Sequence, residues 1–266
     1  MITSDIRHFY VDNNMDLKKT TNILKLVAWP FLLFFGTVAL SAACNKKTTM
    51  PINGGNTPTI NTTVNNPAAK KYLALGDSYT IGTSVIEADR FPVQTAALLN
   101  AAGIPVKVDI IATNGWTTGD LMYAILDKPV TTTFDAVSLL IGVNNQYQGK
   151  GLPAYQQEFT KLVQRAIELA DGKASHVFVL SIPDYSVTPF AGNSNKQQIA
   201  TEIDAFNAAN KMIGDDFKVH YLNVTEESRK AANDPSLIAS DGLHFSGKEY
   251  AVWALQLSAA MQTVLQ

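Results

Sequence analysis

From residue 70 to the carboxyl terminus, short apolar runs alternate with longer segments whose apolar residues recur at helical spacing. Short uninterrupted apolar runs bounded by turn-forming residues are typical of strands that are buried on both faces of a sheet. We expect five such strands, at 72–75, 106–112, 136–141, 176–182 and 219–224.

The segments between these strands carry helical patterns. We expect helices at 91–102, 118–126, 155–170, 197–213 and 246–265. The third is the clearest, because its apolar residues fall on one face and Gly172 closes it. Strands that alternate with helices predict βαβ units with right-handed crossovers. The predicted fold is therefore a three-layer α/β/α sandwich with a central five-stranded parallel sheet in a flavodoxin-like order.

The amino-terminal part of the chain has the pattern of an export signal. Residues 26–43 contain no charged residue and are preceded by three lysines. The small residues Ser-Ala-Ala then lead directly into Cys44, the only cysteine of the chain. A basic start, an apolar stretch and small residues at its end make up a secretory signal peptide. The junction with Cys44 resembles the lipobox of bacterial lipoproteins, which implies that Cys44 is acylated and becomes the first mature residue.

Two alternatives to a lipoprotein stay open. The apolar run is just long enough for a transmembrane anchor, and Cys44 could be incidental. A cleavage-type junction that coincides with the only cysteine favours the lipoprotein. We expect a signal peptide at 1–43, whose true start is Met15, then the lipidated cysteine and a flexible linker at 44–69, and a folded domain at 70–266. The domain would lie outside the cytoplasm, in the cell envelope, anchored to a bacterial membrane through Cys44.

The composition fits this organisation. Asn, Thr, Pro and Gly dominate residues 45–69, which therefore lack the apolar surface that could offset their ordering entropy. The 266 residues carry a formal net charge of −2, so no basic surplus points to a nucleic-acid partner. A single cysteine also excludes an internal disulfide.

Polar residues follow several of the expected strands directly. Ser78 follows the first, Gly115 the second and Asn144 the third, while Asp241 and His244 come after the fifth strand and a loop. In open parallel sheets, ligands bind outside the carboxyl ends of the strands. We therefore expect these five residues to share one edge of the domain.

The five residues together suit nucleophilic catalysis. A serine hydroxyl is a weak nucleophile until a nearby base takes its proton, and His244 is the candidate base for Ser78. Asp241 can hold the other ring nitrogen of His244 and stabilise the imidazolium. An oxyanion could be bound by the backbone N–H groups of Ser78 and Gly115 and by the side-chain amide of Asn144. Gly115 can approach closely because it has no side chain.

These residues lie in motifs that resemble the four catalytic blocks of the SGNH, or GDSL-like, hydrolases. The blocks are GDSYT at Ser78, NG at Gly115, GVNN at Asn144 and DGLH at His244, in the order of that family. The resemblance covers essentially all of 70–266 and implies hydrolysis of carboxylic esters without a metal or organic cofactor. Two positions depart from the family pattern: Tyr79 stands where leucine is usual, and Asn145 replaces an acid. The G-x-S-x-G motif of α/β-hydrolases is absent from the sequence, which argues against that fold.

Each block alone is a weak signal, because GDS, NG and DxxH are also common turns and caps. All four blocks together, each after its proper strand, are a strong signal. Further candidates for the pocket are Asp77, Tyr79, Trp116, Asn145 and Asp184. Asp77 is expected to shape a turn more than to act chemically, and for Asp184 a turn role stands beside a pocket role. The glycine-bearing stretches 147–153 and 187–195 are candidates for a lid or an acyl pocket.

The expected function is that of a serine ester hydrolase of carboxylesterase or lipase type, acting through an acyl-enzyme on Ser78. Two other functions stay open. A surface lipoprotein could bind glycan or lipid in the same cleft without catalysis, and an acyltransferase could pass the acyl group to another hydroxyl. The expected partner is an ester substrate, namely an acylated glycan, a lipid or a small ester, and no motif chooses among them.

Overall fold

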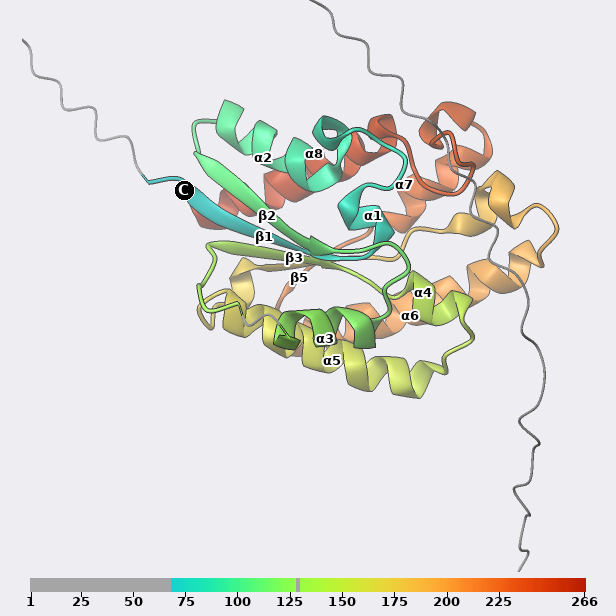
Figure 1. Cartoon of the computed structure of the whole chain (residues 1–266), viewed down its shortest axis with the longest axis horizontal. Helices are drawn as coiled ribbons and strands as arrows, with labels where there is room; N and C mark the ends of the chain where they lie inside the picture. The colour runs from blue at the N-terminus through green and yellow to red at the C-terminus, as the bar shows by residue number, and fades with distance from the viewer. Residues whose placement is uncertain (1–67, 128–129) are drawn as a thin grey trace, which may run out of the picture. The chain divides into compact units, whose positions relative to one another are not determined.

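A five-stranded parallel sheet forms the centre of the described part of the chain and confirms the predicted fold class (Figure 1). The computed structural model describes residues 68–127 and 130–266. The strands are β1 (Lys70–Gly76), β2 (Val106–Ala112), β3 (Ala136–Leu140), β4 (Val177–Leu180) and β5 (His220–Leu222). Their order is β2-β1-β3-β4-β5, and every neighbouring pair is parallel, as in flavodoxin. The order reverses between β1 and β3, which places a crevice at the carboxyl ends of these two strands.

Helices cover both faces of the sheet (Figure 1). On one face, α2 (Phe91–Ala101) packs against α8 (Gly247–Leu265). The other face is covered by α3 (Thr118–Asp127), α5 (Leu152–Leu169) and α6 (Lys196–Phe217). The three-layer arrangement follows from the sequence pattern, because each strand with two apolar faces needs a helix on either side.

The middle strands supply the centre of the core. Residues 72–75 of β1 and all of β3 are fully or almost fully buried. On the α2–α8 side, Trp253 lies with its ring centroid 5.0 Å from that of Tyr250 and 6.1 Å from that of Phe91. These rings fix α2 and α8 against each other, since large aromatic side chains bury the most apolar area.

The bounds of several elements differ from the prediction for local reasons. The fifth strand is shorter than 219–224 because the N–H of Val219 donates to Gly214 and that of Val224 donates to the Ser181 hydroxyl. Helix α5 begins at Leu152, before the expected 155, since Pro153 is well suited to a first helical turn. Helix α6 continues to Phe217 and ends where Lys218 adopts a left-handed conformation.

Three short helices escape the sequence pattern, because a single turn is too brief to show a helical period. They are α1 (Ser78–Ile81), α4 (Val143–Tyr147) and α7 (Thr225–Arg229). The described residues also contain short 3₁₀ turns at Glu87–Asp89, Ala174–His176, Tyr185–Val187, Pro189–Ala191, Lys230–Ala232 and Pro235–Leu237. Helices α1 and α4 each begin directly after a central strand and carry the polar residues of the site.

The expected signal peptide, Cys44 and the tether as far as residue 67 lie outside the described residues. Of the helices in 68–127 and 130–266, none combines the length and the apolar character needed to cross a bilayer.

Candidate active site

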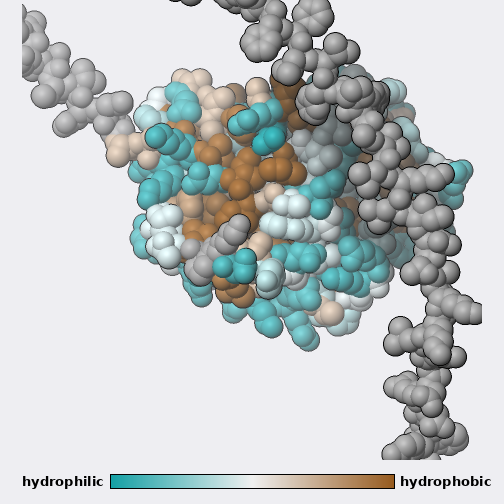
Figure 2. Space-filling view, in the orientation of Figure 1, coloured by the Kyte–Doolittle hydropathy of each residue, from teal (hydrophilic) through white to brown (hydrophobic). Residues whose placement is uncertain are grey.

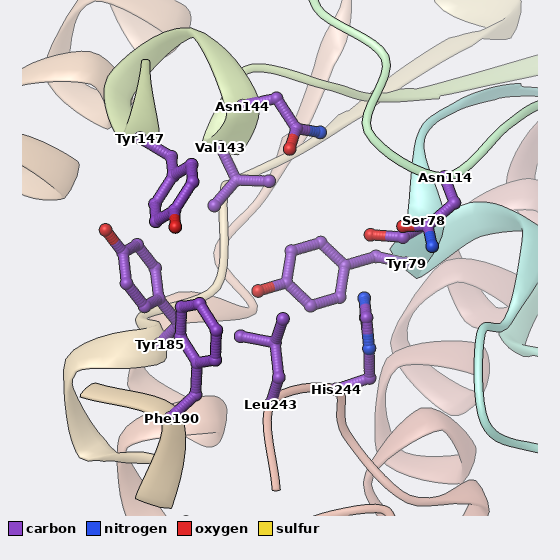
Figure 3. Close-up of a pocket in the computed structure, with 10 residues that line it drawn as sticks. All are labelled: Ser78, Tyr79, Asn114, Val143, Asn144, Tyr147, Tyr185, Phe190, Leu243 and His244. Atoms are coloured by element: carbon purple, nitrogen blue, oxygen red, sulfur yellow. The ribbon is translucent and has the colours of Figure 1, made fainter. Parts of the chain in front are cut away.

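A small pocket of about 120 Å³ opens at the carboxyl edge of the sheet, beside the switch point (Figure 3). It is lined by Ser78, Tyr79, Asn114, Val143, Asn144, Tyr147, Tyr185, Phe190, Leu243 and His244. The structure thus brings Ser78, Asn144 and His244 together at one pocket from three distant parts of the chain, at the edge where the sequence predicts them.

Ser78 is held at the start of α1 by a tight turn. The side chain of Asp77 caps the helix by accepting a hydrogen bond from the Tyr79 N–H at 3.1 Å. Gly76 is required before it, because a Cβ at this position would lie 2.4 Å from the Leu140 carbonyl oxygen. Gly82 ends the helix in a left-handed conformation, and its N–H donates to the Ser78 carbonyl. The nucleophile candidate is therefore fixed at the end of β1, with its residue only 5% exposed.

The environment of Asp77 is unusual for a carboxyl group. The side chain is fully buried, and its Oδ2 atom has no hydrogen-bond partner. Burial raises the pKa of Asp77 to about 7, although the Tyr79 N–H lowers it in part. Asp77 does not line the pocket, in contrast to its place among the pocket candidates, and caps α1 at the turn that the sequence indicates.

Asp77→Asn should change how stability depends on pH. A carboxyl whose pKa is raised from 3.8 to about 7 on folding stabilises the fold fully below pH 3.8, and this contribution is lost as the pH rises through 7. The loss amounts to about 4 kcal/mol, at 1.36 kcal/mol for each unit of pKa. Asparagine also caps helices but does not titrate. Urea denaturation at pH 5 and pH 8 should show a smaller loss in the variant, and equal losses in both proteins would contradict this assignment.

His244 is oriented by Asp241, three residues earlier on the same loop. Asp241 Oδ1 accepts the backbone N–H groups of Leu243 and His244 at 3.0 Å each, and its Oδ2 lies 2.6 Å from His244 Nδ1. Since an ionised carboxylate only accepts, Nδ1 carries the proton and Nε2 is free to act as a base. Figure 3 shows this second ring nitrogen pointing toward the Ser78 hydroxyl.

The charge of Asp241 is stabilised by its surroundings. Partial burial raises the pKa of this carboxyl, but hydrogen bonds from Ser84, His244 and two backbone N–H groups outweigh burial and hold the pKa well below its ordinary value. The carboxylate therefore stays negative beside His244 and favours the imidazolium that would form when His244 takes a proton.

Tyr79 forms the floor of the pocket beside His244. The two rings meet edge to face with centroids 5.6 Å apart, and Tyr79 also packs against Phe245 and Trp253. Burial raises the pKa of Tyr79 well above its usual value, so this phenol is neutral. Tyr79, one of the expected pocket residues, is among the residues that line the pocket.

Asn144 and Gly115, the two expected oxyanion donors besides Ser78, differ in their surroundings. Asn144 lies in the first turn of α4, and its Nδ2 donates one hydrogen bond to the Trp116 carbonyl at 2.9 Å. An amide nitrogen has two hydrogens, so this hydrogen bond leaves the second one unused. Gly115 has a positive φ of 83°, and a Cβ there would meet nothing within 4 Å. The positive φ is what requires glycine at this turn, and the lining residue of the pocket on this loop is Asn114.

Asn145 explains the departure from the acidic residue of the family pattern. Its side chain is fully buried outside the pocket, where Oδ1 accepts the Thr118 N–H at 3.0 Å and Nδ2 donates to the Thr118 hydroxyl at 2.6 Å. The Thr118 hydroxyl in turn bonds to the carboxylate of Glu158. A carboxylate at 145 could not donate and would add a second negative charge near Glu158, so the amide suits this network. Asn145 thus joins α4 to α3 and is not a pocket residue.

Two other pocket candidates lie elsewhere. Asp184 is buried, pairs with Arg229 at 2.9 Å and accepts the Ser186 N–H, so it has the turn role and does not line the pocket. Trp116 lines a separate groove of about 600 Å³ with Ile110, Ile111, Tyr123 and other residues of β2 and α3. Figure 2 shows apolar surface over β2 on this face.

The far wall of the pocket consists of aromatic residues that the sequence does not identify individually. Tyr147, Tyr185 and Phe190 form a cluster in which the ring centroids lie 6.0–6.3 Å apart. Tyr147 and Phe190 come from the stretches 147–153 and 187–195, so each of these stretches supplies one lining residue. Tyr185 is fixed by a hydrogen bond from its hydroxyl to Gln146. No signal in the sequence distinguishes these three rings from the other aromatic residues of the domain.

The site has no cluster suited to a metal. Within residues 68–127 and 130–266, no three His, Asp or Glu side chains gather closely enough to hold a metal ion.

The fold and the arrangement of Ser78, His244 and Asp241 at the edge of the sheet define a protein of the SGNH hydrolase class. The sequence profile of the GDSL-like lipase/acylhydrolase family matches residues 74–252, and the chain belongs to this family.

Solved structures of low sequence identity share the fold. The structure is similar to TesA (TM-score 0.58, 16% identity, covering 73% of this chain and 99% of that chain). It is also similar to the lipase/acylhydrolase from Enterococcus faecalis (0.60, 15%, 73% and 96%). A third similar structure is Axe2, an acetylxylan esterase from Geobacillus stearothermophilus (0.57, 19%, 72% and 94%). None of the curated proteins compared with the chain matches it.

Proposed function

We propose that the protein is a serine ester hydrolase that forms an acyl-enzyme on Ser78. One observation carries the proposal: Ser78 and His244 face each other in the same pocket, and Asp241 Oδ2 lies 2.6 Å from Nδ1, the ring nitrogen of His244 on the opposite side. Family membership supports the reaction class.

In the first half-reaction, Ser78 Oγ attacks the ester carbonyl carbon while His244 Nε2 takes the hydroxyl proton. The carbonyl π electrons move to oxygen, and this oxyanion would be stabilised by the free N–H of the Asn144 side chain and by backbone N–H groups of Ser78 and Gly115. When the tetrahedral intermediate collapses, the bond to the leaving oxygen breaks and His244 gives its proton to the departing alcohol.

In the second half-reaction, water replaces the alcohol. His244 takes a proton from the water as its oxygen attacks the acyl carbon, and the proton then returns to Ser78 Oγ as the carboxylic acid leaves. Asp241 stays ionised throughout because its hydrogen bonds favour the charged form. The same acyl-enzyme could pass to another alcohol, so the choice between hydrolysis and acyl transfer depends on which acceptor reaches this pocket.

The size of the pocket favours a short acyl group. Its volume is about 120 Å³, less than the cavity of about 150 Å³ that can hold a benzene molecule. Tyr147, Tyr185 and Phe190 close the side away from Ser78 with aromatic rings. We propose acetyl to butanoyl esters as substrates, and the description of Axe2 as an acetylxylan esterase is consistent with an acylated glycan as the natural one.

Phe190→Ala should lengthen the acyl chain that the pocket accepts. Phe190 is 48% exposed at the mouth, so its removal opens the aromatic wall without disturbing the core. Chromogenic esters from acetyl to octanoyl should show that the ratio of kcat/KM for hexanoyl over acetyl rises about tenfold, since each methylene in an apolar pocket contributes about 1–3 kcal/mol. Leu255→Ala, an exposed apolar residue of α8, is the matched control. An unchanged ratio in Phe190→Ala would show that this wall does not bind the acyl group.

We also propose that the protein is exported and anchored to a bacterial membrane through a lipid on Cys44. The support is the apolar run 26–43, with three lysines before it and the only cysteine directly after its small residues. In the bacterial cell, Cys44→Ser should prevent incorporation of a labelled fatty acid and move the protein out of the membrane fraction. Continued labelling of the variant would overturn the assignment to Cys44.

A further inference from the structure

Ser84 has a backbone conformation that serine rarely adopts. Its φ is 67°, and the only other non-glycine residues with positive φ in the described chain are Asp171 and Lys218, which follow α5 and α6. A left-handed conformation is unfavourable for an L-residue other than glycine, because its Cβ comes too close to the following carbonyl oxygen. Ser84 lies in the exposed turn after α1, where glycine would fit without this cost. The side chain should therefore compensate for the backbone.

The serine hydroxyl makes one strong contact, to the carboxylate that orients His244. Ser84 Oγ donates to Asp241 Oδ2 at 2.6 Å, although the two residues are 157 positions apart in the chain. The same oxygen accepts the proton of His244 Nδ1, while Oδ1 accepts two backbone N–H groups. Ser84 thus provides the only side-chain hydroxyl among the four donors that these contacts give Asp241.

We propose that Ser84 is a positioning residue that keeps the Asp241 carboxylate in the plane of the His244 ring. The proposal rests on the proposed function, in which His244 is the base for Ser78.

The position of Asp241 shows why a second side-chain donor matters. Its side chain is 30% exposed, so water can reach the carboxylate and compete with His244. The Ser84 hydroxyl, which lies in the turn after the Ser78 helix, donates a hydrogen bond to Oδ2 of this carboxylate. Residues Gly82 and Thr83 in this turn both donate to the Ser78 carbonyl. The Ser84–Asp241 hydrogen bond therefore joins the loop of the nucleophile to the loop of the base and fixes their distance.

Two substitutions separate the effect of losing the hydroxyl from the effect of relieving the backbone strain. Ser84→Ala and Ser84→Gly both remove the donor, but only glycine removes the cost of the positive φ. We expect kcat on a short-chain ester to fall about five- to tenfold in both variants, with KM within twofold, as for the loss of one hydrogen bond of about 1–1.5 kcal/mol. Urea denaturation should show Ser84→Gly to be the more stable variant. If the glycine variant kept full activity while the alanine variant lost it, the residue would serve only the turn.

A double-mutant cycle shows whether the effect passes through Asp241. Ser84→Ala should lower kcat in the wild-type background and have no further effect in Asp241→Ala, because the partner of the hydroxyl is then absent. Equal effects in the two backgrounds would overturn the proposal.

The NMR resonance of the proton on His244 Nδ1, recorded in the full chain, provides a readout that does not depend on turnover. Without the Ser84 hydroxyl, Asp241 Oδ2 no longer shares its lone pairs between two side-chain donors, so the chemical shift of the Nδ1 proton should change in Ser84→Ala. The other titratable groups near the pair are Tyr79 against the ring, Tyr250, and Asp77 beside Ser78, and Ser84→Ala changes none of them. An unchanged resonance of the Nδ1 proton would contradict the positioning role even if the proposed ester hydrolysis failed on every substrate. A shift without any esterase activity would refute the proposed function and keep the coupling of Ser84 to Asp241.

Discussion

Ser78→Ala is expected to lower turnover of a short-chain ester by at least about a thousandfold, because it removes the hydroxyl on which the proposed acyl-enzyme forms. The residual rate should come from the oxyanion donors and from substrate binding, which this substitution leaves in place. KM should change little, since the Ser78 side chain is small and the pocket walls are other residues. The measurement is steady-state hydrolysis of an acetyl ester by the full-length protein.

Ser175→Ala is a suitable control for this result, because it removes a hydroxyl from an exposed position in the turn before β4, at the end of the sheet opposite the pocket. Full activity of Ser78→Ala would refute the acyl-enzyme mechanism. A folded wild-type protein with no activity on any ester, but with saturable binding of an acylated glycan or a lipid, would instead favour a non-catalytic binding protein. Transfer of the acyl group to an added alcohol at the expense of hydrolysis would identify an acyltransferase.

The position of the polar residues at one edge of the sheet could be predicted from the sequence, because it depends mainly on the topology of a parallel sheet. Ser78 and Asn144 follow β1 and β3 directly, so any parallel sheet with these two strands at its centre brings them to one edge. The hydrogen bonds between Asp241 and His244 are equally local, since they lie within one loop of four residues. Such positions follow from the order of the elements and need no knowledge of packing.

The walls of the pocket could not be predicted in the same way. Tyr147 lies at the end of the one-turn helix α4, and Tyr185 and Phe190 lie in 3₁₀ turns. None of these elements has a detectable period, and their place depends on the packing of α4 and α6 around them. Long-range contacts such as Ser84 with Asp241 are also invisible in the sequence, because a serine in a loop gives no indication of its partner.

Asn145 shows a different limit. The sequence reveals that an amide stands where the family usually has an acid, but its meaning depends on Thr118 and Glu158, which are 27 and 13 positions away. The resemblance suggests a pocket residue, whereas the structure shows a buried link between α3 and α4. A departure from a motif is therefore interpretable only when the partners of the changed side chain are known.

Asp241→Asn should reduce kcat by about a hundredfold to ten-thousandfold. An asparagine at this position is neutral, so the imidazolium of His244 loses the negative charge that stabilises it. Its amide can also turn to donate to Nδ1, which would place the proton of the neutral ring on Nε2 and leave no base facing Ser78. The backbone N–H groups of Leu243 and His244 can still bond to the asparagine oxygen, so we expect the loop to keep its shape.

The combined variant distinguishes a catalytic role of Asp241 from a structural one. If Asp241 acts only by supporting His244 as the base for Ser78, then Asp241→Asn should cost nothing further in kcat once Ser78 is alanine, because residues that act as a unit are not additive. If the two losses multiply, Asp241 must support the residual reaction by another route, such as holding the pocket in shape. Unfolding curves at pH 7 for Ser78→Ala, Asp241→Asn and the combined variant separate that case from simple destabilisation. If the site keeps its shape, the variants should unfold like the wild type, apart from the lost contribution of the Asp241 charge. That contribution is present above pH 3.8 and is lost as the pH falls toward the lowered pKa of the folded state, so the Asp241→Asn protein should also lose less stability in acid than the wild type does.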